Sequence, residues 1–201
     1  MKSRWFIAIT FALLCACNQK LPGSKSIRIV GVNNISDQDR LVIQKRLSEG
    51  NTSETASYQF HQLEGNVTIE AKLAVDNSDI QYLLGHQGNF RVASAGGLPW
   101  FNQKDILQTS VGFDEQQKTL LKLTLTDAAA KRVARLTDTP EDMTVLIMLD
   151  GETLSTARLT SPILDGAMQI TLDRTPHEAM LIAKLIGSGP LSFQAKDLQI
   201  K

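Results

Sequence analysis

Short segments with two different hydrophobic periods alternate along the chain, and their order predicts the secondary structure. In residues 67–73 every second side chain is apolar, as in a half-buried strand. A helical period instead follows Ser36, a residue type that favours helix N-caps. The first group of segments predicts strand, helix, strand, strand, helix and strand. These elements are expected at 26–32, 36–50, 58–63, 67–73, 77–84 and 89–94.

A second group of segments follows residues 95–99, where Gly and Pro concentrate and the strand period stops. Asp150-Gly151 separates two apolar segments and indicates a two-residue hairpin, because glycine tolerates the positive φ of such a turn. Thr175, Pro176 and Glu178 form a capping box with proline at the first helical position. Strands are expected at 109–113, 120–125, 145–149, 153–159, 167–172 and 191–200, and helices at 126–136 and 175–187.

The element order of the first group is that of a split βαβ unit, in which helices cover one face of a sheet. We therefore expect an α+β protein with a ferredoxin-like βαββαβ base over 26–97. The residues that follow Cys17 are numerous enough to bury a core as one domain or as two small ones.

The N-terminus has the layout of a signal peptide. Lys2 and Arg4 precede an apolar segment at 5–14, which is followed by small residues around two cysteines. A helix needs roughly 20 apolar residues to cross a bilayer core, and polar residues begin at Asn18. This segment is therefore too short for a permanent span, and 1–16 is expected to be a cleaved signal peptide.

The sequence Leu-Cys-Ala-Cys at 14–17 resembles the lipobox of bacterial lipoproteins. In that family the last cysteine receives a diacylglyceryl group and its freed amine is acylated, which supplies the several chains that stable anchoring requires. The resemblance implies lipid on Cys17, a lipidated tether over 17–25 and a place in the cell envelope facing the periplasm. Asn18 favours the outer membrane, because an aspartate there would retain such proteins at the inner membrane. The alternative is an ordinary signal peptide that leaves a free thiol at Cys17.

Charge and cysteine content exclude several classes of protein. Basic and acidic residues each number 21, and loss of Lys2 and Arg4 with the signal peptide would change the net charge from +0 to −2. Nothing indicates the clustered basic surface of a nucleic-acid-binding protein, so no nucleic-acid partner is expected. The two cysteines are Cys15 and Cys17, and the mature fold would therefore hold no disulfide and no cysteine metal site.

The remaining candidates for catalysis or metal binding favour structural roles. His61, His86 and His177 are far apart and lack the spacing of metal ligands. The acidic residues considered as acid and base pairs each fall at a turn or a helix start, where carboxylates cap backbone amides; they are Asp76, Asp79, Asp138, Glu141, Asp142 and Asp150. Gly-x-Ser-x-Gly, the context of an activated serine, is absent from the sequence. No enzyme activity, metal or cofactor is expected.

Trp100 and Phe101 directly follow the Gly- and Pro-rich segment at 95–99, where the two modules should meet. Two interpretations remain open for them. Aromatic rings bury a large area, which favours a buried plug between the modules. An exposed position would instead make both residues a contact for an extended peptide, and they are therefore candidate partner-binding residues.

A series of short matches in the second half of the chain is similar to a known family. The matching residues are 145–152, Ile163, Asp165-Gly166, Ile170, Thr175, Glu178-Ala179, Ala183-Lys184-Leu185 and Gly187-Ser188-Gly189. In order and spacing they resemble the first periplasmic domain of SecD, a subunit of the protein-export machinery. In that family a ferredoxin-like base carries an inserted head, and the chain then returns to the base. The resemblance implies a base over 26–97, a head over 98–190 and a closing strand in 191–201.

The resemblance to SecD implies a binding or accessory role. The chain would be a membrane-anchored lipoprotein that contacts the export machinery or translocating and newly exported polypeptides. SecD works with SecF through membrane helices that carry proton-coupling charges, and no apolar segment of that length follows Cys17. The chain is therefore not expected to couple a proton gradient by itself. One alternative is a structural envelope lipoprotein with one fixed outer-membrane or cell-wall partner, and a third hypothesis is an unrecognised hydrolase.

Overall fold

The computed structural model describes residues 24–48, 57–139, 143–159 and 161–201. The expected signal peptide, the lipobox and Cys17 lie outside the described residues. In the part of the chain that the structure describes, the helices are all too short or too polar to cross a membrane.

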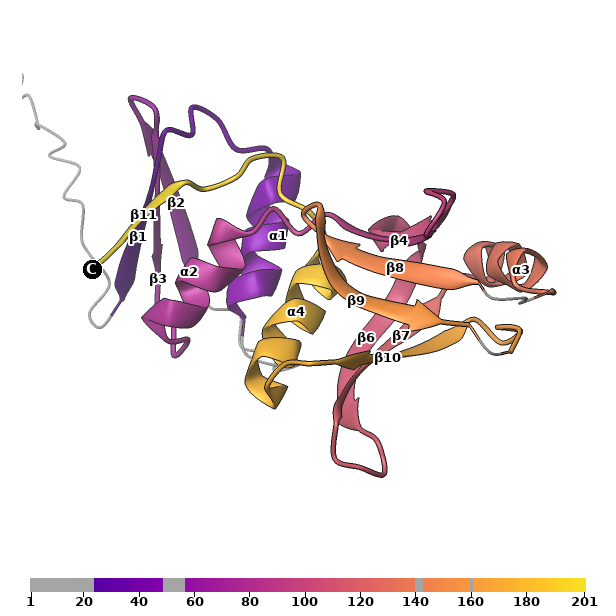
Figure 1. Ribbon diagram of the computed structural model, residues 1–201. Helices are drawn as coiled ribbons and strands as arrows, with labels where there is room; N and C mark the ends of the chain where they lie inside the picture. The colour runs from indigo at the N-terminus through magenta and orange to yellow at the C-terminus, as the bar shows by residue number, and fades with distance from the viewer. Residues whose placement is uncertain (1–23, 49–56, 140–142, 160) are drawn as a thin grey trace, which may run out of the picture.

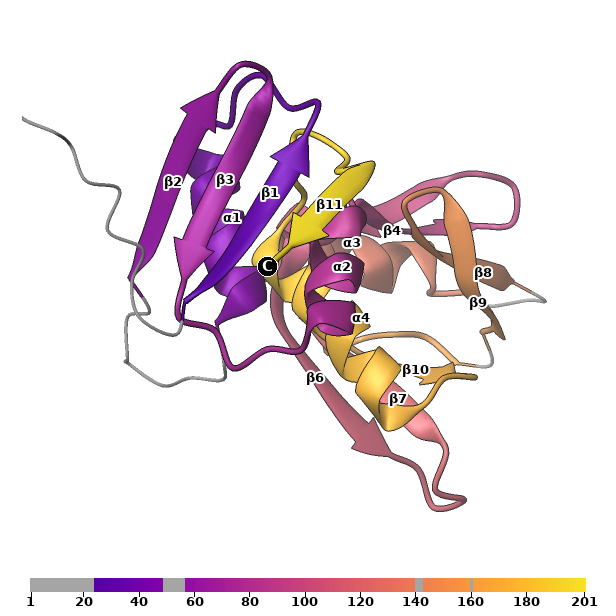
Figure 2. The ribbon, with the colours of Figure 1, turned by 90° about the vertical axis from the view of Figure 1, so that its left-hand side faces the viewer.

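The first sheet is antiparallel and has the strand order β11-β1-β3-β2 (Figure 2). Its strands are β1 (Lys25–Val30), β2 (Tyr58–Leu63), β3 (Asn66–Ala71) and β11 (Asp197–Ile200). Successive side chains of a strand point to opposite faces, and Ile27, Ile29 and Ile69 are fully buried on one face of the sheet. One helix precedes β2 and a second follows β3, so the arrangement confirms the α+β class with a ferredoxin-like βαββαβ unit.

Helices α1 (Asp37–Leu47) and α2 (Asn77–Gly85) cover the apolar face of this sheet (Figure 1). Helix α1 begins at Ser36 as predicted, because the Ser36 hydroxyl accepts a hydrogen bond from the Asp39 amide and the Asp39 carboxylate accepts one from the Ser36 amide. We call the first sheet together with α1 and α2 the base.

Two further sheets and helix α3 (Asp127–Leu136) form a second unit, which we call the head. One sheet has the order β5-β4-β8-β9 and the other β10-β7-β6. The strands are β4 (Phe90–Ser94), β5 (Pro99–Asn102), β6 (Ile106–Phe113), β7 (Thr119–Leu125), β8 (Thr144–Leu149), β9 (Glu152–Arg158) and β10 (Ala167–Leu172). Apolar side chains from both sheets, α3 and the last helix form its core.

Helix α4 (Pro176–Ser188) lies between the base and the head (Figure 1). It begins at the predicted capping box of Thr175 and Glu178. It packs against α1 and α2 on one side and against β6 and β7 on the other, which explains why most of its residues are buried. Two layers of helices, α1 with α2 and then α4, therefore separate the base sheet from the head strands β6 and β7.

Strand pairing differs from the sequence prediction at the end of the first module. Segment 89–94, expected as the last strand of the base, forms β4 and pairs with β5 and β8 of the head. Its place beside β1 is taken by β11, which begins at Asp197 and is shorter than the expected 191–200. Residues 95–98 form the turn between β4 and β5 within one sheet. An alternating apolar pattern marks a strand but carries no information on its distant partner.

Candidate functional site

The chain passes between the base and the head through two connections that lie side by side. The outgoing connection, residues 86–89, leads from α2 of the base to β4 of the head. The returning connection, residues 189–196, leads from α4 back to β11 of the base. The Leu191 amide donates a hydrogen bond of 2.9 Å to the Gln87 carbonyl. We call this place, residues 86–89 and 188–192, the junction.

Arg46 on α1 binds both connections at once. Its side chain is 0% exposed and donates five hydrogen bonds. Nη1 donates to the carbonyls of Leu83 and His86, at 2.6 Å each. Nη2 donates to the carbonyls of Gln87, at 2.7 Å, and Gly189, at 2.8 Å. Nε donates to the Ser188 hydroxyl at 3.3 Å. One side chain of the base therefore ties together the ends of α2 and α4 and the start of the head.

Hydrogen bonds replace the water that the Arg46 guanidinium has lost. Burial lowers the pKa of Arg46 to about 10, and the negative charge of Asp150 opposes this shift. The group therefore remains protonated at neutral pH. Because a buried charge is costly unless it is hydrogen-bonded, the surrounding carbonyls are what make this position tolerable for an arginine.

Asp39 binds the returning connection from the first turn of α1. Its side chain is 2% exposed, and its oxygens accept from the Ser192 amide over 2.7 Å and from the Ser192 hydroxyl over 2.8 Å. Burial opposes the charge of Asp39, but hydrogen bonds from Ser192 and Ser36 outweigh it and hold the pKa of the carboxyl below its ordinary value. Asp39 and Arg46 thus fix the returning chain at two points along α1.

The turn between β8 and β9 fixes the outgoing connection from the side of the head. Asp150 Oδ1 accepts from the amides of Gly88 over 2.8 Å and Asn89 over 2.7 Å. Gly88 has a φ of +86°, a conformation that favours glycine, and a Cβ atom there would collide with the Arg46 guanidinium. The outgoing connection is therefore enclosed between α1 and the head.

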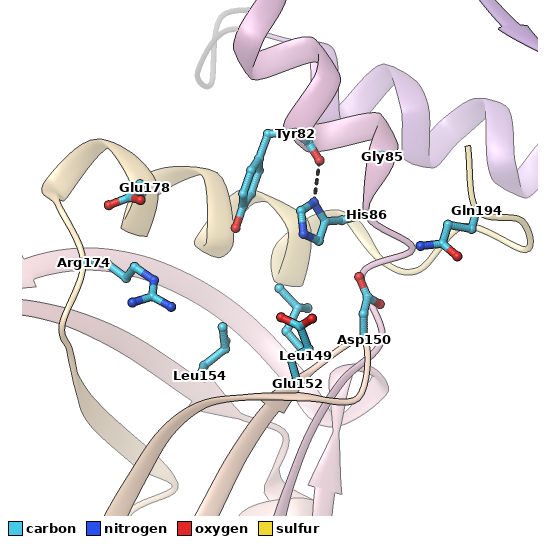
Figure 3. A pocket seen from close by; sticks show the side chains of 10 residues that line it. All are labelled: Tyr82, Gly85, His86, Leu149, Asp150, Glu152, Leu154, Arg174, Glu178 and Gln194. Atoms are coloured by element: carbon cyan, nitrogen blue, oxygen red, sulfur yellow. Dashed lines mark hydrogen bonds between the residues drawn. The ribbon is translucent and has the colours of Figure 1, made fainter. Parts of the chain in front are cut away.

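A cavity of about 340 Å³ lies beside the junction (Figure 3). Its walls come from the end of α2, the β8–β9 hairpin, the start of α4 and the returning connection. The residues that line it are Tyr82, Gly85, His86, Leu149, Asp150, Glu152, Leu154, Arg174, Glu178 and Gln194. Because the base and the head both contribute walls, the shape of the cavity depends on how the junction holds them.

Acidic groups outnumber basic groups around this cavity. Figure 3 shows Glu178 beside Arg174 at one end and Glu152 near Asp150 at the other. Burial raises the pKa of the Tyr82 phenol; the charge of Arg174 lowers it, and the surrounding carboxylates raise it further. The phenol is therefore neutral and able to donate a hydrogen bond, and the site is suited to binding a polar or charged group above an apolar floor.

The three histidines remain separate in the structure. His86 lines the cavity with its Nδ1 atom 2.8 Å from the Tyr82 carbonyl. His177 Nε2 lies 2.9 Å from Asp79 Oδ1 and thereby links α4 to α2, while His61 is exposed on β2. Within the described ranges, no group of three or more His, Cys, Asp or Glu side chains could hold a metal ion.

Trp100 and Phe101 lie on β5 in the core of the head. They are 1% and 2% exposed, and the Phe101 ring packs 6.4 Å from the Phe90 ring. Because both side chains are buried, neither can contact a partner at the surface, and the contact with an extended peptide that the sequence left open is wrong for this structure. The two rings are buried, as their size favours, but they lie within the core of the head and not between the two modules as the buried plug would require.

Sequence reasoning does not single out the cavity residues Tyr82, Glu152 and Arg174, and it also misses the two buried charged residues of the junction, Arg46 and Asp39. Both stand in a helix of mixed polar residues, where charged side chains normally face solvent. Asp39 has one local signal, its position three residues after the helix cap Ser36. Arg46 has none, because its acceptors are mostly backbone carbonyls and any residue type can supply those.

Comparison with known proteins shows the family. The family model described as the P1 head subdomain of SecDF matches residues 89–193, just over half of the chain. The protein translocase subunit SecD of Acidaminococcus fermentans is 25% identical over 150 residues, which cover 75% of this chain. The match spans only 36% of the length of that relative.

Two solved structures share the fold. A crystal structure of SecDF in a super-membrane-facing form has a TM-score of 0.69 at 16% identity, over 89% of this chain and 30% of that chain. A structure of SecDF described as a membrane component that enhances protein export has a TM-score of 0.65 at 17% identity, over 88% of this chain and 97% of that chain. The similarity to these structures concerns the fold, and the family follows from the match over 89–193. By that match, the chain belongs to the SecDF P1 head subdomain family.

Proposed function

We propose that the chain is a non-catalytic, periplasm-facing accessory module of protein export that binds translocating or newly exported polypeptides. The observation that carries this proposal is the cavity beside the junction, which combines leucine side chains with charged and hydrogen-bonding groups. An unfolded polypeptide presents groups of both kinds. The relatives add support, since one is a protein translocase subunit and another is described as enhancing protein export.

The proposal includes a division of the chain at the junction. The base would comprise residues 25–85 and the strand that closes its sheet, and the head would begin at the outgoing connection, 86–89. This places the first limit before the 97 expected from the sequence, because β4 pairs within the head. Helix α4 would then connect the two units and transmit any change in their relative position.

Crosslinking in cells tests the binding role. A photoreactive amino acid in place of Glu152, at the mouth of the cavity, is expected to capture a spread of exported polypeptides or subunits of the export machinery, identified by mass spectrometry. The same replacement at Glu115, an exposed glutamate in the turn between β6 and β7, is the matched control and should capture none of them.

Other results of this experiment would contradict the proposal. Capture of one defined outer-membrane or cell-wall protein at Glu152 would instead support a structural lipoprotein with a fixed partner. Equal capture of the same polypeptides at Glu152 and Glu115 would mean that the cavity has no special role in binding.

We also propose that lipid on Cys17 holds the chain at the outer membrane. The order Leu-Cys-Ala-Cys at 14–17 supports this anchor. Cys17→Ala is expected to abolish incorporation of a labelled fatty acid and to release the protein from the membrane fraction, because acyl chains supply the binding energy. Cys15→Ala keeps the acceptor cysteine and should retain both. Membrane association that survives in Cys17→Ala would contradict the lipid anchor.

A further inference from the structure

We propose that the cavity beside the junction receives the side chain of a lysine or arginine carried by the bound polypeptide. This inference rests on the proposed function and adds the chemical class of the group that enters the cavity. Charge complementarity and the shape of the cavity carry it, in three steps.

The charged groups that line the cavity are unbalanced. Asp150, Glu152 and Glu178 are acidic, Arg174 is the arginine among the lining side chains, and His86 is the histidine. Arg46 lies behind Asp150 and offsets part of its charge, so Glu152 and Glu178 provide most of the attraction for a cation. A peptide carboxylate in the same place would meet a net negative charge and be repelled.

The carboxylates differ in how free they are to receive a ligand. Glu178 accepts hydrogen bonds from the amide and hydroxyl of Thr175, and Asp150 Oδ1 is occupied by Gly88 and Asn89. Asp150 Oδ2 is buried without a hydrogen-bond partner among the described residues. Glu152 is exposed at the mouth and is therefore the carboxylate best placed to bind an incoming ammonium or guanidinium group.

The surroundings of these charges fit a long basic side chain. Leu149 and Leu154 line the cavity between the charged groups, and the aliphatic stem of lysine or arginine packs on such surfaces while its charged end remains near polar groups. At the end of α2 the negative end of the helix dipole is already compensated, because Arg46 donates to the carbonyls of Leu83 and His86. At the start of α4, whose dipole favours anions, Glu178 already fills that role as part of the capping box.

A pair of peptides that differ in one charge tests the inference on the purified full chain. Both are fluorescent, unstructured decapeptides of Gly, Ser and Leu; one carries a central lysine and the other acetyl-lysine, which removes the charge. Fluorescence anisotropy is expected to give about threefold tighter binding of the lysine peptide, the size of a partly exposed ion pair. Glu152→Gln should abolish this preference, Glu115→Gln should preserve it, and Arg174→Gln should increase it.

The outcomes separate this inference from the proposed function. Equal binding of both peptides by the unaltered chain, or a lysine preference that survives in Glu152→Gln, would overturn the basic side chain as the ligand and leave polypeptide binding intact. Failure of both peptides to bind would overturn the proposed function and this inference with it. A preference that disappears only in Glu152→Gln supports both.

Discussion

Replacing Arg46 by methionine should lower the free energy of unfolding by about 4 kcal/mol, the cost of disrupting a buried charged network. Methionine retains much of the stem but donates no hydrogen bond. The carbonyls of Leu83, His86 and Gly189 would lose their bonds to Arg46, and each buried unsatisfied group costs about 1–3 kcal/mol. The Gln87 carbonyl would lose its bond to Arg46 but keep the one from the Leu191 amide. For a chain of this size the change corresponds to a fall in Tm of about 10 °C. Urea and thermal unfolding measure both quantities.

Two further variants distinguish the role of Arg46 in the junction from general stability. Lys45→Met removes the neighbouring exposed cation of α1 and should change stability little. Arg46→Lys keeps the charge but has fewer donors, so it should fold and still loosen the junction. Spin labels on Gln59 in the base and Lys118 on the head should then show a broadened distance distribution. An unchanged distribution together with unchanged stability would show that Arg46 does not hold the junction.

Features that depend on neighbouring residues could be predicted from the sequence. Asp150 and Gly151 adopt φ values of +51° and +90°, as the predicted two-residue hairpin requires. Helix α4 begins at the capping box of Thr175 and Glu178, and α1 begins at Ser36. In each case the residues that determine the structure lie within a few positions of one another, so the chemistry is visible in the sequence.

Features that depend on distant partners could not be predicted from the sequence. Phe90 and Val92 alternate as a strand should, but the pairing of β4 with β8 joins segments more than 50 residues apart. The sequence does not predict strand β5, because the Gly- and Pro-rich segment before it indicates a boundary, whereas in the structure that segment is the turn of a hairpin. Trp100 is consequently a core residue of the head.

The junction could not be predicted either, because its contacts join residues that are far apart in the sequence. The sequence predicts a turn at Asp150, but its carboxylate also accepts a hydrogen bond from the amide of Asn89, 61 residues earlier in the chain. Arg46 binds carbonyls on both connections, and a carbonyl has no signature in the sequence. The resemblance to SecD predicted the fold and the family, while the cavity and the residues that hold its walls required the structure.

Replacing Asp39 by asparagine is expected to cost about 2 kcal/mol at neutral pH, because charged hydrogen bonds to Ser192 and Ser36 are weakened and an amide donor is turned toward other donors. The folded state holds the pKa of Asp39 below its ordinary value. The charged Asp39 carboxylate therefore stabilises the folded state fully above the pKa that it has in the unfolded chain, about 3.9. This stabilisation is lost as the pH falls through the lower pKa that Asp39 has in the folded chain. The difference in unfolding free energy between the two proteins should be large at pH 7 and smaller at pH 3, as measured by urea denaturation.

Asp37→Asn is the matched control, because Asp37 lies in the same turn of α1 with a side chain that is 100% exposed. It should change stability little at either pH. A cost of Asp39→Asn that is equal at pH 7 and pH 3 would mean that the shape of the side chain, and not its charge, holds Ser192. If the cost is instead pH-dependent, the returning connection is held by charge at two points of α1, Asp39 and Arg46, and the walls of the cavity owe their position to one helix of the base.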